Sequence, residues 1–362
     1  MKYAANRFAL PSAILAGLAL LAAAGSAAAQ GSTAGSAEKQ ASRLPDCAAA
    51  WSPAAPYAAG SIASRGGVNY TAAFWTQGNA PEQGQAWQSG KRCRPAAQAK
   101  AKAADHDANF PPNTLKFLKA NTGLDGEQWD NIMKLVNKPE QDSLEWTKFY
   151  GYCEDIKDKR GYTIGIFGAT TGGSNDEGPD GPTLFKEFDA SSGASNPSIA
   201  GGLARAGVHG SMQGKILKIS DSAKVFCDKI GGLQNNPAWR DAMWNTFYKV
   251  YIQYSVQQAR QRGFSSALTI GSFVDTALNQ GAAGDSGTLQ GLLSRSGNSS
   301  DEKTFMTTFY AQRSKIVDTN HYNQPPNGKN RVKQWSTLLN QGETDLKNAD
   351  AAVQKVTDWE MK

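Results

Sequence analysis

The sequence predicts two folded parts, a small all-β domain followed by a larger, mainly α-helical domain with a small β element. Three observations support this. Residues 47–93 form short aromatic segments between turn residues and two cysteines, typical of a small β domain. Residues 94–108 are rich in Ala and Lys, as in a linker. Beyond Pro111, apolar residues recur at helical spacing.

The first 29 residues predict a secretory signal peptide. Lys2 and Arg7 precede an apolar run at 14–21, and three alanines at 27–29 offer a cleavage site. The apolar run is short for a membrane span, so a retained anchor is the weaker alternative. The small, polar residues 30–44 suit a flexible leader. We therefore expect a secreted, extracellular protein with no membrane partner.

Cysteine and histidine usage favours disulfides over metal binding. In an exported chain, four cysteines are typical of disulfides, and three pairings are open. The pairing that needs no cross-link between domains joins Cys47 to Cys93 and Cys153 to Cys227. The three histidines are scattered singly, without metal-binding spacing, and no phosphate-loop motif occurs. We expect no metal and no cofactor.

In the second domain, the first elements follow from local signals. Thr114 is expected to cap a short helix. Residues 127–136 place apolar side chains at helical spacing, and Pro139 is expected to end that helix, leaving Glu140 just past its end. The β-branched and aromatic run 162–169 predicts a strand.

Three later helices are also expected. Pro237 begins a long helix that reaches about Arg262 with a continuous apolar face. A second helix is expected near 265–278 and a third near 305–316. The second domain is therefore mainly α, and no internal repeat of 20–50 residues is present.

Charge is concentrated in one segment. The chain carries a formal net charge of +6, yet residues 140–189 hold 11 carboxylates against 5 basic side chains. Within residues 140–163, six of these acids alternate with tryptophan, phenylalanine and tyrosine. This pattern suggests a bound cationic ligand and suits sugar cleavage, whereas a solvated helix face would contain fewer large rings. The sequence lacks the basic stripe that is typical of nucleic-acid-binding proteins, so we expect no nucleic-acid partner.

The first domain contains the run Y-T-A-A-F-W-T-Q-G-N-A-P at 70–81, followed by Trp87 and Cys93. These residues carry a resemblance to carbohydrate-binding modules of family 5/12. It implies binding to chitin or chitosan through exposed rings. The candidate rings are Tyr70, Phe74, Trp75 and Trp87. The alternative for the two tryptophans is a place in the core of the domain.

In residues 109–362, Glu140 is followed by Leu144 and Trp146, then by Y-C-E-D-I at 152–156 and D-K-R-G-Y-T at 158–163. These motifs carry a resemblance to glycoside hydrolase family 46, the chitosanases. It implies a two-lobed, lysozyme-like fold with a cleft, in the subgroup that carries a Cys153–Cys227 disulfide. The expected domains are a signal peptide (1–29), a leader (30–44), the module (45–94), a linker (95–108) and the catalytic domain (109–362).

The resemblance also implies roles for single residues. Glu140 becomes the general acid and Asp158, 18 residues later, the general base of an inverting hydrolysis. Thr163 would position the attacking water. Arg160 would orient Asp158, or else form an ordinary ion pair.

Asp275 stands out because it lies within the apolar run G-S-F-V-D-T-A-L, where an unpaired carboxylate is costly. The resemblance implies that Arg313 and Arg331 are its partners, in a network that helps to hold Glu140. A purely structural salt bridge is the alternative.

The acidic segment points to a polymer that carries protonated amines. Asp155, Asp176 and Glu154 are the candidate contacts for the ammonium groups of chitosan or partially acetylated chitin. The leading hypothesis is a secreted, monomeric endo-chitosanase that cleaves β-1,4 bonds. The alternatives are hydrolysis of chitin or peptidoglycan, and a non-enzymatic chitin-adhesion protein.

Overall fold

The computed structural model describes residues 44–94, 105–176, 178–317 and 327–359, with side chains at 327–329 left aside. The predicted signal peptide, most of the leader and residues 95–104 of the linker lie outside this part. The described residues fall into two compact units, one dominated by residues 44–94 and the other by residues 107–346. No helix in these ranges combines the length and the apolar character needed to cross a membrane.

The first unit contains a three-stranded antiparallel sheet, with strands in the order β1 (Ile62–Arg65), β2 (Val68–Ala72) and β3 (Trp87–Arg92). A short turn at Gly66 and Gly67, both with positive φ, joins β1 to β2. Ala63, Ala72, Ala86 and Trp87 form the core, and the Cys47–Cys93 disulfide links the two ends of the unit. The predicted all-β domain is confirmed.

The second unit is mainly helical, as predicted. Its helices are α3 (Pro112–Thr122), α4 (Gly126–Gln141), α5 (Gly181–Ser191), α6 (Ile199–Arg205), α7 (Ala223–Gly232), α8 (Pro237–Phe247), α9 (Gln253–Gln261), α10 (Ala267–Gln280), α11 (Leu289–Arg295), α12 (Glu302–Val317), α13 (Asn327–Gln341) and α14 (Asp350–Val356). Its strands are β4 (Cys153–Glu154), β5 (Thr163–Ile164), β6 (Ala169–Thr170), β7 (Gly210–Gln213) and β8 (Ile216–Ile219), which form one three-stranded and one two-stranded sheet.

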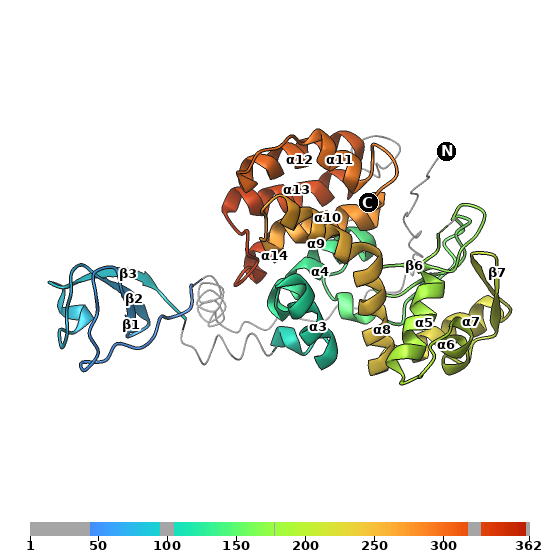
Figure 1. Cartoon of the computed structure of the whole chain (residues 1–362), viewed down its shortest axis with the longest axis horizontal. Coiled ribbons are helices and arrows are strands. Elements are labelled where there is room, and N and C mark those ends of the chain that lie inside the picture. Colours follow the sequence, from blue (N-terminus) through green and yellow to red (C-terminus); the bar gives the residue numbers. More distant parts are fainter. Residues whose placement is uncertain (1–43, 95–104, 177, 318–326, 360–362) are drawn as a thin grey trace, which may run out of the picture. The chain divides into compact units, whose positions relative to one another are not determined.

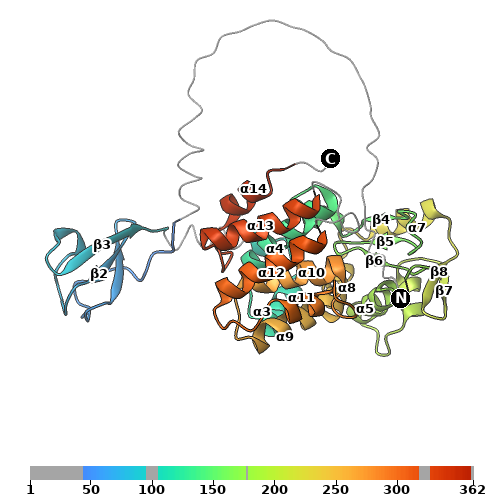
Figure 2. The same ribbon diagram turned by 90° about the horizontal axis from the view of Figure 1, so that it is seen from above.

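These elements form two groups. Helices α5, α6 and α7 lie with the two sheets on one side of α8, and helices α10 to α14 lie on the other (Figure 1). Seen from above, β4, β5 and β6 lie beside α7 (Figure 2), where the Cys153–Cys227 disulfide joins β4 to α7. A π turn at Tyr248–Ile252 joins α8 to α9, so one nearly continuous helix runs between the groups. The predicted helix from Pro237 to about Arg262 is thus confirmed.

Buried aromatic rings hold α4 and α8 together. Trp129, Trp146 and Trp244 are fully buried. The rings of Trp146 and Trp244 meet edge to face with centroids 5.7 Å apart, and Trp129 meets Trp244 at 5.8 Å. Such packing contributes both apolar burial and favourable ring geometry. It fixes the helix that carries Glu140 against the central helix.

Two predicted helix boundaries are wrong. The first helix begins at Pro112, because proline suits the first helical position, and the Thr114 hydroxyl donates to Asp241 Oδ1 at 2.6 Å instead of capping it. The second helix continues through Pro139 to Gln141. Proline cannot donate to the Leu135 carbonyl one turn earlier. Gln334 Nε2 donates to that carbonyl at 2.6 Å, so the acceptor remains satisfied.

The predicted strand at 162–169 is also corrected. Only Thr163–Ile164 and Ala169–Thr170 are strands, and they pair antiparallel with each other. Gly165 and Gly168 have positive φ (73° and 67°), which reverses the chain between them. The segment is therefore a hairpin, which returns the chain past Thr163.

Candidate active site

Glu140 lies in the last turn of α4, and Arg331 of α13 holds it. Arg331 Nη1 lies 2.7 Å from Glu140 Oε1, with the Glu140 side chain 19% exposed. Glu140 Oε1 makes no directed hydrogen bond to the described residues, so this contact is an ion pair. Charge, rather than hydrogen-bond direction, therefore holds this oxygen.

Asp275 lies behind Arg331 and is fully buried. Its Oδ1 accepts from Arg331 Nε at 2.9 Å and Nη2 at 2.7 Å, and its Oδ2 accepts from Arg313 Nη1 at 2.7 Å. Trp335 Nε1 donates to the same Oδ2 at 3.1 Å. The structure therefore brings together the four charged residues that the sequence associates, although each comes from a different helix.

The protonation states follow from this pairing. Burial by itself would raise the pKa of the Asp275 carboxyl, but the guanidinium groups of Arg331 and Arg313 lower it. Burial likewise opposes the charge on Arg331, whose pKa is nevertheless raised by Asp275 and Glu140. Asp275 is thus a buried anion, and Arg331 stays positively charged beside Glu140.

Asp158 lies in a tight loop and pairs with Arg160. Arg160 Nε donates to Asp158 Oδ2 at 2.6 Å, and the Arg160 backbone N–H donates to Oδ1 at 3.0 Å. Lys157 and Lys159 on either side have positive φ, 61° and 66°, so Asp158 lies between two left-handed residues. The side chain of Asp158 is 10% exposed.

A second loop supports the Asp158 loop. The Gly172 N–H donates to the Arg160 carbonyl at 2.9 Å, and the Asn175 N–H donates to the Lys159 carbonyl at 3.1 Å. The backbones approach so closely that a Cβ on Gly173 would lie 2.1 Å from the Lys159 oxygen. This close approach explains the glycine run after β6 and binds the loop of Asp158 to the loop of Asp176.

Within the part of the chain that the structure describes, two buried polar groups near this loop have no hydrogen-bond partner. Thr163 on β5 is 7% exposed, and its Oγ1 makes no hydrogen bond to a described residue. The Nη2 of Arg160 is buried and likewise has no partner among these residues. Buried polar atoms are normally hydrogen-bonded, so each of these is suited to bind water or ligand.

The acids on the strand before Asp158 differ in their contacts. Glu154 on β4 accepts a hydrogen bond from Tyr152 Oη at 2.8 Å. Burial and the nearby Glu154 carboxylate raise the pKa of Tyr152. Asp155 accepts from Lys157 Nζ at 2.7 Å and from the Lys157 N–H at 3.0 Å. Despite some burial, these bonds lower the pKa of Asp155. Sequence reasoning assigned no role to Tyr152, since its partner became evident only from the structure.

Asp176 lies in the loop between β6 and α5. The Thr170 hydroxyl donates to its Oδ2, and the Gly178 N–H donates to its Oδ1 at 3.1 Å. Both Asp176 oxygens therefore have donors from the same loop region, which orients the carboxylate.

In the first unit, the candidate rings separate into two classes. Phe74 and Trp75 are 55% and 63% exposed. Trp87 is 5% exposed, donates from Nε1 to the Asn79 carbonyl at 2.9 Å and packs edge-on against Tyr57. The expectation that Trp87 faces a polymer is therefore corrected, because a mini-domain needs one large ring for its core. Tyr70 packs partly against that core.

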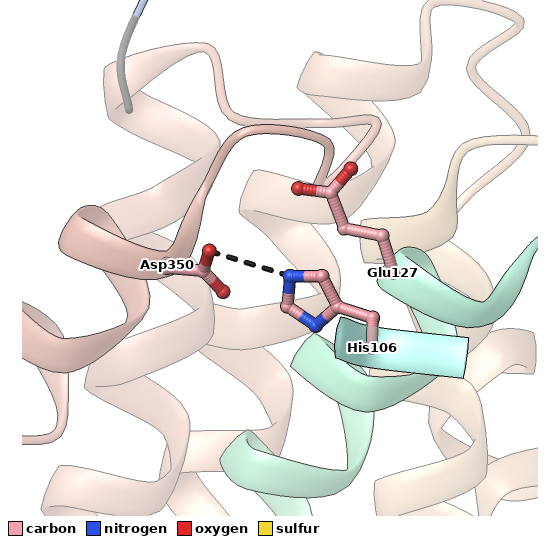
Figure 3. A group of neighbouring side chains, drawn as sticks. All are labelled: His106, Glu127 and Asp350. Atoms are coloured by element: carbon pink, nitrogen blue, oxygen red, sulfur yellow. Dashed lines mark ion pairs between the residues drawn. The ribbon is translucent and has the colours of Figure 1, made fainter. Parts of the chain in front are cut away.

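Among the described histidines, His106 is the one that lies in a group of side chains that could hold a metal ion. Figure 3 shows it ion-paired with Asp350, with His106 Nε2 3.4 Å from Asp350 Oδ2. The Asp350 carboxylate is therefore a protein partner of the His106 imidazole. The expected absence of a metal remains a prediction.

Comparisons with known proteins agree with both parts of the sequence interpretation. The model of glycosyl hydrolase family 46 matches residues 134–178 and 217–349, and that of carbohydrate-binding module family 5/12 matches residues 50–88. A chitosanase from Niallia circulans is 70% identical over 264 residues, which is 73% of this chain and 88% of the relative. A chitosanase from Nocardioides sp. (strain N106) is 50% identical over 68 residues, 18% of this chain and 24% of the relative.

One solved structure to which this chain is similar is the native chitosanase from Bacillus subtilis MY002. It is 20% identical and matches with a TM-score of 0.48 over 62% of this chain and 93% of that chain. Both predicted disulfides, Cys47–Cys93 and Cys153–Cys227, are formed. The extent of the match to the Niallia circulans relative decides the classification: the chain belongs to glycosyl hydrolase family 46, with a carbohydrate-binding module of family 5/12 preceding the hydrolase domain.

Proposed function

We propose that this protein is a secreted endo-chitosanase that hydrolyses β-1,4 bonds between glucosamine units with inversion of configuration. The observation that carries the proposal is the pair of carboxylates, Glu140 and Asp158, each held by its own arginine within this family's domain. The 70% identical relative named chitosanase supports the choice of substrate.

Glu140 is proposed as the general acid. Such an acid must protonate the glycosidic oxygen as the bond breaks. Arg331 contacts Glu140 Oε1 at 2.7 Å, while the side chain keeps 19% of its surface exposed. In this proposal the proton is carried by Oε2, and the adjacent guanidinium stabilises the carboxylate that remains after proton transfer.

Asp158 is proposed as the general base that removes a proton from the attacking water. Arg160 donates hydrogen bonds to both of its oxygens, which orients the carboxylate. The buried Thr163 Oγ1, which has no hydrogen-bond partner among the described residues, would accept or donate one further hydrogen bond to that water. Attack from the face opposite the leaving group inverts the anomeric carbon.

The substrate proposal rests on charge. Asp155, Glu154 and Asp176 are proposed to contact the ammonium groups of glucosamine units. The hydrogen bonds to Asp176 come from a hydroxyl and a backbone N–H, so no cation of the protein neutralises it in those contacts. The exposed rings Phe74 and Trp75 are proposed to hold the enzyme on insoluble chitin or chitosan. Export is proposed from the N-terminal 29 residues.

The test uses soluble, partially acetylated chitosan cleaved in heavy-oxygen water by the wild-type enzyme and by Glu140→Gln. We expect wild-type activity that falls as acetyl content rises, label at each newly formed reducing end, and loss of at least about a thousandfold in kcat in the variant. Nuclear magnetic resonance of fresh products should show the α-anomer first.

Specific outcomes would contradict the proposal. Activity that rises with acetyl content would indicate a chitinase, and lysis of cell walls without chitosan cleavage would indicate a peptidoglycan hydrolase. A fully active Glu140→Gln enzyme would exclude Glu140 as the acid. A wild-type protein that binds chitin but cleaves none of these polymers would indicate adhesion.

A further inference from the structure

The loop that carries Asp176 is fixed at its first residues. The Thr171 N–H donates to the Tyr162 carbonyl at 3.0 Å, and Thr171 Oγ1 accepts from the Tyr162 N–H at 2.9 Å. The Leu217 N–H of β8 donates to the Thr171 carbonyl at 2.8 Å. The start of the loop therefore belongs to the sheets beside it.

The last residue of the loop, Asp180, is held differently. It occupies the N-cap position of α5, yet its side chain makes no capping hydrogen bond. Asp180 is 8% exposed and accepts from Tyr251 Oη at 2.9 Å. An aspartate at this position ordinarily bonds to the first turn of its own helix. Here the carboxylate bonds to the central helix instead.

The π turn of the central helix sets the position of Tyr251. The Gln253 N–H donates to the Tyr248 carbonyl, five residues back, as in a π turn. The ring of Phe167 stacks on Phe247, with centroids 5.1 Å apart, and meets Tyr251 edge to face at 6.2 Å. Packing against Phe167 restrains the phenol, so its hydroxyl presents a fixed donor to Asp180. Because π turns are frequent at functional sites, the turn at Tyr248–Ile252 suggests a functional role for this segment.

A short path leads from Asp180 to Asp176. The next residue, Gly181, lies so close to β6 that a Cβ there would be 2.6 Å from the Thr170 carbonyl oxygen. Thr170 in turn donates its hydroxyl to Asp176 Oδ2. A displacement of Asp180 would therefore be transmitted through the start of α5 to Thr170, the residue that orients Asp176.

We propose that Tyr251 is a positioning residue, which acts through Asp180 to hold the Asp176 loop in its substrate-binding form. The inference rests on the proposed function, since it takes Asp176 as a contact for a glucosamine ammonium group. Tyr251 itself touches no substrate in this proposal. Loss of the Tyr251 hydroxyl should weaken binding of chitosan without affecting the acid and base steps.

The test is Tyr251→Phe in the full chain, which removes only the hydroxyl. We expect KM for soluble chitosan to rise about fivefold with kcat within about twofold of wild type. Amide hydrogen exchange across residues 171–180 should become faster. The matched control is Tyr254→Phe, a partly exposed tyrosine on α9, which should change neither quantity.

Asp180→Ala, which removes the acceptor of the Tyr251 hydroxyl, provides a second variant, and the double variant with Tyr251→Phe completes the cycle. Because the two residues act as a pair, the double variant should show the KM of either single variant, not their product. Unchanged KM and unchanged exchange in Tyr251→Phe would overturn the inference. So would a fall in kcat equal to the rise in KM, or multiplicative KM effects. If the wild-type enzyme cleaves no chitosan, the proposed function fails, while the exchange experiment still decides whether Tyr251 orders the loop.

Discussion

At the scale of single residues, the site depends on which polar atoms have protein partners. Asp158 uses both oxygens on Arg160, whereas Thr163 Oγ1 is buried without a partner among the described residues. A buried hydroxyl of this kind is costly unless it binds something during function. Substitution of Thr163 can therefore separate the role of its hydroxyl from that of Glu140, the proposed general acid.

Thr163→Val should lower kcat on soluble chitosan about ten- to a hundredfold with little change in KM, since a misplaced water slows attack more than it weakens binding. Thr163→Ser keeps the hydroxyl and should retain most of the activity. Steady-state kinetics measure both. Equal activity in the valine and serine variants would show that the hydroxyl has no part in the reaction.

The pairing of Asp275 predicts how stability changes with pH. Because its arginine partners lower the pKa of the folded-state carboxyl, Asp275 stabilises the fold above its unfolded pKa of about 3.9. That stabilisation is lost as the pH falls through the lower, folded-state value. Asp275→Asn should lower stability by about 3–5 kcal/mol at neutral pH, because two buried guanidinium groups lose their anion.

The same variant should also flatten the dependence of unfolding free energy on pH below about pH 4. Urea unfolding at a series of pH values measures both effects. Asp228→Asn, at an exposed ion pair on α7, is the control and should leave stability within about 0.5 kcal/mol of wild type. An unchanged slope in Asp275→Asn would mean that other acids dominate acid unfolding.

At the scale of elements, the last turn of α4 shows how one side chain compensates for proline. The helix continues through Pro139 because Gln334 of α13 donates to the Leu135 carbonyl at 2.6 Å. Without this donor, a buried carbonyl would be unsatisfied one turn before Glu140. Helix α13 thus supplies both Gln334 and Arg331 to the end of α4.

Gln334→Ala should therefore destabilise the protein by about 1–3 kcal/mol. In a Pro139→Ala background the cost should be smaller, because an alanine N–H at position 139 can donate to Leu135 itself. Denaturant unfolding of the four proteins gives the interaction energy. Strictly additive effects would show that Gln334 acts elsewhere. Gln354→Ala, an exposed side chain on α14, is the control.

At the scale of the whole molecule, two units with separate functions share one chain. The exposed rings Phe74 and Trp75 belong to the first unit, and the acidic site belongs to the second. Binding to a solid polymer and cleavage of a soluble one should therefore respond to different substitutions.

Trp75→Ala should lower binding to insoluble chitin or chitosan about ten- to a hundredfold, because a large exposed ring contributes roughly 1.5–3 kcal/mol when it is buried on a ligand. Hydrolysis of soluble chitosan should be unchanged. Ile62→Ala removes another exposed apolar side chain of the same unit (55% exposed) and is the matched control. Pull-down with solid polymer and reducing-sugar release measure the two activities. Equal losses on both substrates would assign the ring a different role.

Local patterns were informative where a signal lies within a short segment. Helical spacing identified the helix from Pro237, and cysteine distribution favoured the two disulfides that form. Composition alone gave a wrong prediction where single residues within a segment change the direction of the chain. The run at 162–169 has the composition of one strand, but Gly165 and Gly168 turn it into a hairpin.

The sequence by itself therefore determined the two families and the α and β character of the two parts, and it favoured the observed pairing of the cysteines. Only the tertiary structure decided that Trp87 is core while Trp75 is exposed, and that α4 passes through Pro139. It also decided that Tyr251 donates to Asp180. The physical reason is that burial and hydrogen-bond satisfaction depend on residues far apart in the chain, which become neighbours only when the helices pack.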